Sequence, residues 1–294
     1  MLNNTFRAIV GLMVCLTVLP HAFAQIRVTD DRGVNIHLSE PARRVITLSP
    51  HATELVFAAG GGGFLAATVD ASDFPKAARS LPRIGAGLQP EPERLLRLLP
   101  DLVIGWQASQ FSTLNSLRTP LFLSAPKTLD DIPDTIEKLG ALFDTQDIAR
   151  ARATGLRTLL EPLKSASSDG SRVRVFLQVG ETPEYTLNRT HLLSQVVQAC
   201  GGINVFGSAM AIAPKISIES VLAQRPELIL LGSVGAPEQP TLDPVAQQFW
   251  ARMNLPAALA GHVYVMDSDV LNRPGPRLIE AAQAICSMIQ QARK

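Results

Sequence analysis

The sequence predicts an α/β protein of two similar lobes with mostly parallel sheets, joined by a long rigid helix and enclosing a ligand cleft between them. Short β-branched runs alternate with helical patterns before Leu129 and again after Ser168, whereas the stretch between them carries only helical signals. In addition, EPERLLRLLPDLVIGW (residues 91–106) is matched in pattern by SIESVLAQRPELILLG (residues 217–232). A repeated α/β unit on either side of a helical stretch is the simplest account of both observations.

Length and composition fit an ordinary globular protein. The chain has 294 residues, 46% of them apolar and 18% charged, so it can bury a sizeable core. Its formal net charge of +1 gives no support to nucleic acid or an anionic membrane surface as a partner.

The first 24 residues have the three parts of a cleaved secretory signal. Arg7 precedes an apolar run over residues 8–19, and small residues surround the end of the segment at Ala22 and Ala24. Cys15 leaves a lipoprotein alternative open, although Val14 before it fits that signal poorly. We therefore expect a signal peptide over residues 1–24 and a mature periplasmic protein.

The first lobe is expected over residues 25–145. Residues 26–38 alternate around a turn at Gly33, which predicts a hairpin. A β-branched run at residues 45–48 is followed by a helix that stops at the glycines of residues 60–63. Further strands are expected in FLAATV, in DLVIG and in PLFLS.

Two helices are expected between the lobes. The pair Asp130 and Asp131 before Pro133 predicts the start of one, and Thr145 can cap a second that runs from Gln146. Pro162 indicates an end or kink in this second helix. The loop-like run at residues 165–171 then predicts a boundary, giving a linking helix over residues 146–168.

The second lobe is expected over residues 169–294, where the alternation restarts with VRVFLQV and ends in a helix from about Pro276. Glu93 and Glu219 are 126 residues apart, and so are Pro100 and Pro226. This constant offset favours a duplicated lobe, although two generic α/β units could drift into similar patterns.

Two cysteines, Cys200 and Cys286, remain after removal of the signal. In an oxidising compartment an even pair is read first as a disulfide. Two separate buried thiols are the alternative, because the sequence does not show whether the residues are adjacent in space.

Ligand-binding residues are expected in the loops at the carboxyl ends of the strands. Trp106 follows one strand directly and is either a flat apolar wall of the cleft or a core residue. Tyr185 lies in a later loop rich in Glu and Pro. Asp269 and Arg273 share the last such loop, where they either orient a ligand or pair with each other.

His51 also follows a strand end and is a further candidate ligand-binding residue. The other histidines of the mature chain show no ligand spacing with it, so we expect no protein-made metal site. No nucleophile elbow, paired metal histidines or phosphate-cradling loop stands out. The residues therefore favour a binding protein without a cofactor over an enzyme. An α/β enzyme that uses His51 as a base, and an adhesion or scaffold protein, are the other possibilities.

Several motifs together resemble the periplasmic vitamin B12-binding proteins that feed ABC importers. They are RRVITLSPHATELVFAAG, SDFP, ERLLRLLPDLVIGW, VFLQVGETPEYT, VVQACGGINVF, ESVLAQRPELIL and RPGPRLIEAAQAIC. The resemblance covers nearly the whole mature chain and implies a monomer with a corrinoid in its cleft. Related proteins carry haem or ferric siderophores, which is the alternative ligand class.

The resemblance also implies roles for single residues. Trp106, Tyr185, Asp269 and Arg273 match ligand-contacting positions, while Cys200 and Cys286 match a disulfide of the second lobe. Glu93 and Glu219 correspond to surface carboxylates that dock into a dimeric ABC permease of the inner membrane. Three positions that are aromatic in such proteins are small here, with Phe74 nearby as a substitute contact; they are Ala71, Gly87 and Ala213.

Overall fold

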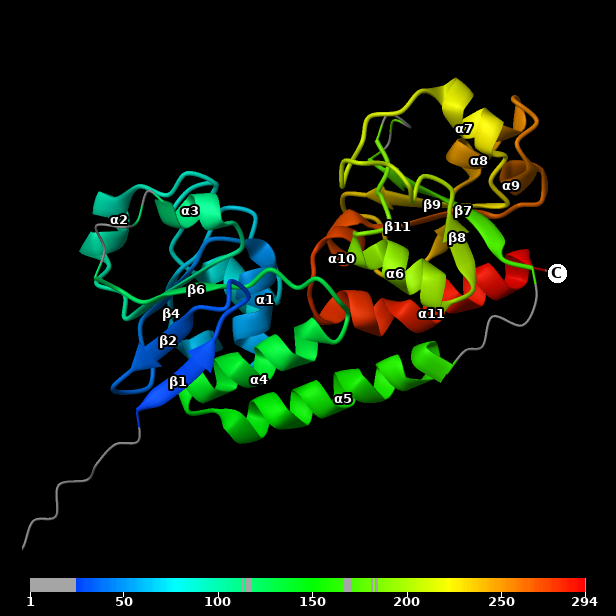
Figure 1. Ribbon diagram of the computed structural model, residues 1–294. Helices are drawn as coiled ribbons and strands as arrows, with labels where there is room; N and C mark the ends of the chain where they lie inside the picture. The colour runs from blue at the N-terminus through cyan, green and yellow to red at the C-terminus, as the bar shows by residue number, and fades with distance from the viewer. Residues whose placement is uncertain are drawn as a thin grey trace, which may run out of the picture.

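A computed structural model describes residues 25–112, 114, 118–165, 171–180, 182 and 185–293 of the chain. Two α/β lobes stand side by side, and two long helices run beneath them (Figure 1). The predicted signal peptide, residues 1–24, lies outside the described residues. No helix within the described part combines the length and the apolar character needed to cross a membrane.

The first lobe has an antiparallel hairpin and a parallel sheet. The hairpin consists of β1 (Ile26–Thr29) and β2 (Asn35–Leu38), as the alternating pattern predicts. The four strands of the sheet lie in the order β4-β3-β5-β6 and are β3 (Val45–Thr47), β4 (Leu65–Ala67), β5 (Leu102–Gly105) and β6 (Leu121–Leu123). Its helices are α1 (Pro50–Ala58), η1 (Gly62–Phe64), η2 (Lys76–Ser80), α2 (Pro92–Arg97) and α3 (Ala108–Ser112).

The second lobe is built on a five-stranded sheet in the order β10-β11-β9-β7-β8. All its pairings are parallel except that of the short edge strand β10. The strands are β7 (Val173–Val179), β8 (Gly202–Asn204), β9 (Leu228–Ser233), β10 (Thr241–Leu242) and β11 (Val263–Asp267). The helices are α6 (Leu192–Ala199), α7 (Ile218–Gln224), α8 (Pro244–Ala251), α9 (Pro256–Leu259), α10 (Ser268–Asn272) and α11 (Pro276–Ala292).

The two sheets share one strand order. The order β4-β3-β5-β6 of the first lobe corresponds to β8-β7-β9-β11 of the second, and β10 is an addition at the edge. The repeated sequence pattern supplies α2 with β5 in one lobe and α7 with β9 in the other. The topology therefore agrees with the repeat that the sequence predicts.

The helices between the lobes are α4 (Asp131–Phe143) and α5 (Gln146–Ser165). They pack so closely that a Cβ at Gly140 would collide with the Cβ of Ala149. The guanidinium of Arg157 on α5 donates to the carboxylates of Asp134 and Glu137 on α4, both at 2.7 Å. The helix α5 continues through Pro162, so an end at that residue is wrong.

One apolar cluster extends through both lobes. It includes Val45 and Leu55 of the first lobe, Leu156 of α5, and Val196 and Ile285 of the second lobe, all of them buried. The final helix α11 contacts α5, α6 and α1, and therefore touches both lobes. The lobes thus share a buried base beneath the cleft.

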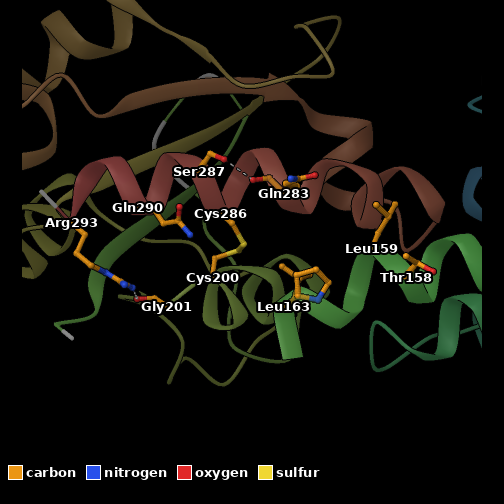
Figure 2. A pocket seen from close by; sticks show the side chains of 11 residues that line it. Thr158, Leu159, Leu163, Cys200, Gly201, Gln283, Cys286, Ser287, Gln290 and Arg293 are labelled. Atoms are coloured by element: carbon orange, nitrogen blue, oxygen red, sulfur yellow. Dashed lines mark hydrogen bonds between the residues drawn. A yellow bond between two sulfur atoms is a disulfide. The ribbon is translucent and has the colours of Figure 1, made fainter. Parts of the chain in front are cut away.

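A disulfide joins Cys200, which ends α6, to Cys286 of α11, and their Cα atoms are 4.7 Å apart. The predicted disulfide is therefore confirmed. It ties the final helix to the second lobe on the side where α5 passes (Figure 2).

Candidate ligand-binding cleft

A large cavity of about 1010 Å³ lies between the lobes. In the first lobe its walls come from the start of α1 and from the loops that follow β5 and β6. In the second lobe they come from the end of β7, residues 187–191 and 212–213, the first turns of α6 and α11, and residues 272–274. Most of the lining is apolar, including Ala125, Leu187, Ile212, Pro274 and Leu278. A cavity of this size at a lobe interface can enclose a large, flat organic ligand.

A second cavity, of about 370 Å³, lies beside the disulfide between α5 and α11 (Figure 2). Leu159 and Leu163 of α5 face Gln283 and Gln290 of α11 across it. Since this smaller cavity is on the helical base and away from the carboxyl ends of the strands, we take the inter-lobe cleft as the candidate site.

Trp106 lines the cleft, as expected for a wall, and its loop is firmly anchored. The backbone N–H groups of Trp106 and Gln107 donate to Oε1 of buried Gln110 at 2.8 and 3.0 Å. The amide nitrogen of Gln110 in turn donates to the carbonyl oxygens of Leu48 and Gly87 at 3.0 and 2.8 Å. Trp106 is 38% exposed, whereas the other tryptophan, Trp250, is 1% exposed in the core of the second lobe.

His51 is buried behind Trp106, with the two ring centroids 6.1 Å apart and the planes nearly perpendicular at 81°. Its Nε2–H donates to the carbonyl oxygen of Ser124 at 3.0 Å, and Nδ1 accepts from the Ser49 hydroxyl at 3.2 Å. Burial, together with the positive charge of Arg273, lowers the pKa of His51 to about 4 against the opposing effect of the Ser124 bond. A neutral ring with both nitrogens engaged supports the Trp106 wall.

His191 reaches the same cleft from the second lobe. As the N-cap of α6, its Nδ1 accepts from the N–H of Leu193 at 3.2 Å. Burial lowers the pKa of His191 to about 4, so this ring is also neutral at physiological pH. The sequence patterns did not single out His191 as a site residue. It has no metal-ligand spacing to the other histidines, and a histidine is not one of the usual N-cap residues.

Lys127 also lines the cleft and was not singled out from the sequence. It lies four residues after β6, so the rule that strand ends carry the site would have included it. Its carbonyl oxygen accepts from Nε2 of Gln195 on α6 at 2.6 Å. This bond connects the two lobes directly at the cleft.

Asp269 and Arg273 pair with each other, with Nη2 of Arg273 2.5 Å from Oδ2 of Asp269. Nη1 of Arg273 also lies 3.1 Å from Glu54 and 2.8 Å from Asp73 of the first lobe. Among the described residues lining the cavity are the neighbours Asn272 and Pro274, but not Arg273 itself. Burial raises the pKa of Asp269. For Asp73, burial opposes ionisation, but the hydrogen bond and charge of Arg273 outweigh it and lower the pKa.

Arg277 adds a second ion pair between the lobes. Its Nε and Nη2 donate to the two carboxylate oxygens of Glu54 at 3.1 and 2.7 Å. Its guanidinium also stacks on the ring of Phe74, 4.2 Å from the centroid. We call Glu54, Asp73, Asp269, Arg273 and Arg277 the inter-lobe ion cluster.

The remaining predicted ligand residues lie around the cleft in different ways. Tyr185 is exposed, and its backbone forms an isolated antiparallel β-bridge with Lys215. Ala213 lines the cleft, and the carbonyl oxygen of Ala71 accepts from Arg273 at 3.1 Å. Gly87 has φ +79°, and a Cβ there would approach the carbonyl oxygen of Leu48 to 2.6 Å. The backbone of this loop therefore excludes an aromatic residue at position 87.

Glu93 and Glu219 occupy the first turns of α2 and α7, and both are exposed. The two helices lie on the sides of their lobes away from α5 (Figure 1). Hydrogen bonds from its own backbone N–H and from the Ser217 hydroxyl lower the pKa of Glu219. Both carboxylates are thus available to a partner that approaches both lobes at once.

Residues 45–270 match the sequence profile of the periplasmic binding protein family. The vitamin B12-binding protein of Vibrio cholerae serotype O1 is 33% identical over 258 residues, covering 86% of this chain and 91% of the relative. The vitamin B12-binding protein of Vibrio parahaemolyticus is 34% identical over 262 residues, with coverages of 87% and 92%.

The fold is also similar to that of solved periplasmic binding proteins. The periplasmic vitamin B12 binding protein of Vibrio cholerae has a TM-score of 0.77 at 32% identity, covering 86% of this chain and 99% of its own. A periplasmic haem-binding protein from Roseiflexus has a TM-score of 0.70 at 22% identity, with coverages of 86% and 100%, and shares the fold. With the two-lobed fold, the cleft and these matches together, the chain belongs to the family of periplasmic binding proteins.

Proposed function

We propose that this protein captures cobalamin or a related corrinoid in the periplasm and delivers it to an ABC permease. The observation that carries the proposal is the inter-lobe cavity of about 1010 Å³ with Trp106 in its wall, in a chain 33% identical to a vitamin B12-binding protein. A corrinoid is a broad macrocycle with apolar faces and amide edges, which suits an apolar cleft with a few polar groups at its rim.

The domain boundaries are part of the same proposal. Residues 1–24 act as a cleaved signal, residues 25–145 and 169–294 form the two lobes, and residues 146–168 connect them. In this arrangement Trp106 and His51 act from the first lobe, while Tyr185, Asp269 and Arg273 act from the second and Phe74 closes the rim. The cargo is a transported ligand, so no resident cofactor or catalytic step is proposed.

Arg273 has to change partners if it binds the ligand. In the structure its donors are bound to Glu54, Asp73, Asp269 and the Ala71 carbonyl. A corrinoid amide that accepts from Arg273 would replace the bond to Asp73, which is half exposed and therefore more easily solvated than Glu54.

The permease contact is proposed through Glu93 and Glu219. One carboxylate on each lobe allows a dimeric permease to engage both lobes with the same arginine-lined pocket. The protein is proposed to act as a monomer, because one copy already presents two such sites.

A haem or ferric-siderophore ligand is the second candidate. The observation that favours it is the small side chain of Ala213 in the cleft wall, where an aromatic contact with a corrinoid is expected. Its loss removes apolar contact and leaves room for a ligand of another shape.

Titration of the mature protein with cyanocobalamin, hemin and a ferric hydroxamate by calorimetry separates these ligands. We expect saturable heat and a shifted visible band with cyanocobalamin. Binding of hemin or the ferric chelate alone would reject the corrinoid and keep the transport class. If all three ligands fail to bind, both candidates are wrong.

A further inference from the structure

The polar side chains that line the cleft are neutral or cationic. Among the described lining residues, Lys127 has the one side chain that is charged at neutral pH, because His51 and His191 are held neutral. No Asp or Glu side chain belongs to the described lining. The cleft is therefore a largely apolar space with a single cation at its wall.

Lys127 has a fixed backbone and an ammonium group without an ion pair to any described residue. Its backbone N–H donates to the carboxylate of Asp131 at 2.7 Å, and the N–H of Thr128 donates to the same oxygen at 2.9 Å. Asp131 thus holds the loop through the backbone N–H groups of Lys127 and Thr128. The ion pairs among the described residues do not include the side chain of Lys127. The charge of Lys127 remains available to a ligand.

His191 lies across the lobe boundary from Lys127. Gln195 is one turn after His191 on α6, and its Nε2 reaches the carbonyl oxygen of Lys127 at 2.6 Å. Because Nδ1 of His191 accepts from Leu193, the proton of the neutral ring is on Nε2. His191 therefore presents a donor at the same end of the cleft as the ammonium of Lys127.

We propose that Lys127 and His191 form an anion subsite of the cleft, which receives the phosphodiester of a corrinoid's nucleotide loop. The inference rests on the proposed function and adds a specificity to it. Lys127 is exposed in the structure; a bound macrocycle that covers it would remove water from its charge, and the ligand would then have to supply the opposite charge. Cobalamin carries one phosphodiester, whereas cobinamide lacks the nucleotide loop and this anion.

The test compares cyanocobalamin with dicyanocobinamide in calorimetric titrations of the mature protein. The variant Lys127→Met keeps most of the apolar stem and removes the charge, and Lys127→Arg keeps the charge. We expect Lys127→Met to weaken cyanocobalamin by about tenfold or more and dicyanocobinamide by less than about threefold. Lys127→Arg should lie within about threefold of the unaltered protein for both ligands.

Two controls separate the subsite from general effects. Lys76→Met removes an exposed lysine of the first lobe that does not belong to the cavity lining, and should leave both affinities unchanged. His191→Asn keeps a side-chain cap for α6 and should weaken cyanocobalamin selectively, by a smaller factor than Lys127→Met. Melting temperatures of all variants establish that they are folded.

The outcomes are distinct. Equal weakening of both corrinoids by Lys127→Met, or no weakening, overturns the anion subsite while the proposed function stands. Binding of neither corrinoid by the unaltered protein rejects the proposed ligand. If hemin binds instead, Lys127→Met is compared on hemin and its dimethyl ester, and an anion subsite requires the selective loss to fall on the free carboxylates.

Discussion

Arg277 of the second lobe donates two hydrogen bonds to the carboxylate of Glu54 in the first, at 3.1 and 2.7 Å. The side chain of Glu54 is only 2% exposed, and Arg273 also bonds to it. An ion pair with both partners largely buried is strongly destabilised when one partner is removed, because the other charge stays in a medium of low dielectric constant. This ion pair therefore stabilises one arrangement of the two lobes relative to each other.

Glu54→Gln should lower the free energy of unfolding by about 3–5 kcal/mol, since two arginines lose their buried carboxylate. Urea unfolding followed by circular dichroism measures the effect. Glu238→Gln is the matched control, because Glu238 contacts the same Arg277 at 3.4 Å but is 58% exposed. Its effect should stay below about 1 kcal/mol. Equal effects of the two changes would contradict a stabilising role for the buried ion pairs of Glu54.

The stability of the protein should depend on His51 in mildly acidic solution. The pKa of His51 is lowered from 6.5 to about 4 in the folded chain. Between these values the unfolded chain binds the extra proton, so the stability contributed by neutral His51 is complete above pH 6.5 and is lost as pH falls towards 4. The slope is at most about 1.4 kcal/mol per pH unit.

Urea unfolding at several values between pH 7 and pH 4.5 tests this dependence. His51→Gln should make the fall in stability shallower. His191, whose pKa is also lowered to about 4, accounts for part of the remaining slope. A slope that His51→Gln does not alter would mean that folding does not lower the pKa of His51.

Trp106→Ala should weaken corrinoid binding by about 30-fold, because removal of a large central aromatic contact typically costs about 2 kcal/mol. Calorimetric titration with cyanocobalamin gives the affinity. Trp250→Phe is the control, since Trp250 is buried in the second lobe and should affect stability without changing the affinity. If Trp106→Ala binds as tightly as the unaltered protein, Trp106 is not a wall of the occupied site.

Charge reversal at both Glu93 and Glu219 should abolish most transport and leave ligand affinity unchanged. Each carboxylate is exposed in the first turn of its helix, away from the cleft lining. Uptake of labelled cobalamin in a strain that depends on this protein measures transport. Glu40→Lys, at another exposed position, should transport normally. Unchanged uptake by the double variant would reject the docking surface.

Local patterns were enough to predict most of the fold. The hairpin β1–β2, the strand β3 and the helix α5 begin and end within a few residues of the predicted positions, and α4 begins where it was predicted to, because turn residues and caps fix these positions locally. The strands β8 and β10 were not predicted, since three and two residues carry too little periodicity. Pro162 was misleading because the helix α5 accommodates it near its end.

The site was less predictable because its geometry depends on distant partners. Glu54 is separated from Arg273 and Arg277 by 219 and 223 residues, so nothing in its neighbourhood indicated a buried carboxylate. For Asp269 and Arg273, the sequence left pairing and ligand binding open, and the structure shows that the two are paired. The position of Lys127 beside α6 depends on a contact between the lobes that no local pattern encodes.

The position of α11 at the end of the chain sets the order in which the molecule can be completed during synthesis. The sheet of the first lobe is finished by residue 123, and both sheets are finished by residue 267. Arg277, however, lies near the start of the final helix. Until the segment from Arg273 to Arg277 emerges, Glu54 has no counter-charge from the second lobe, so a nascent chain can hold two folded sheets without yet having a defined cleft.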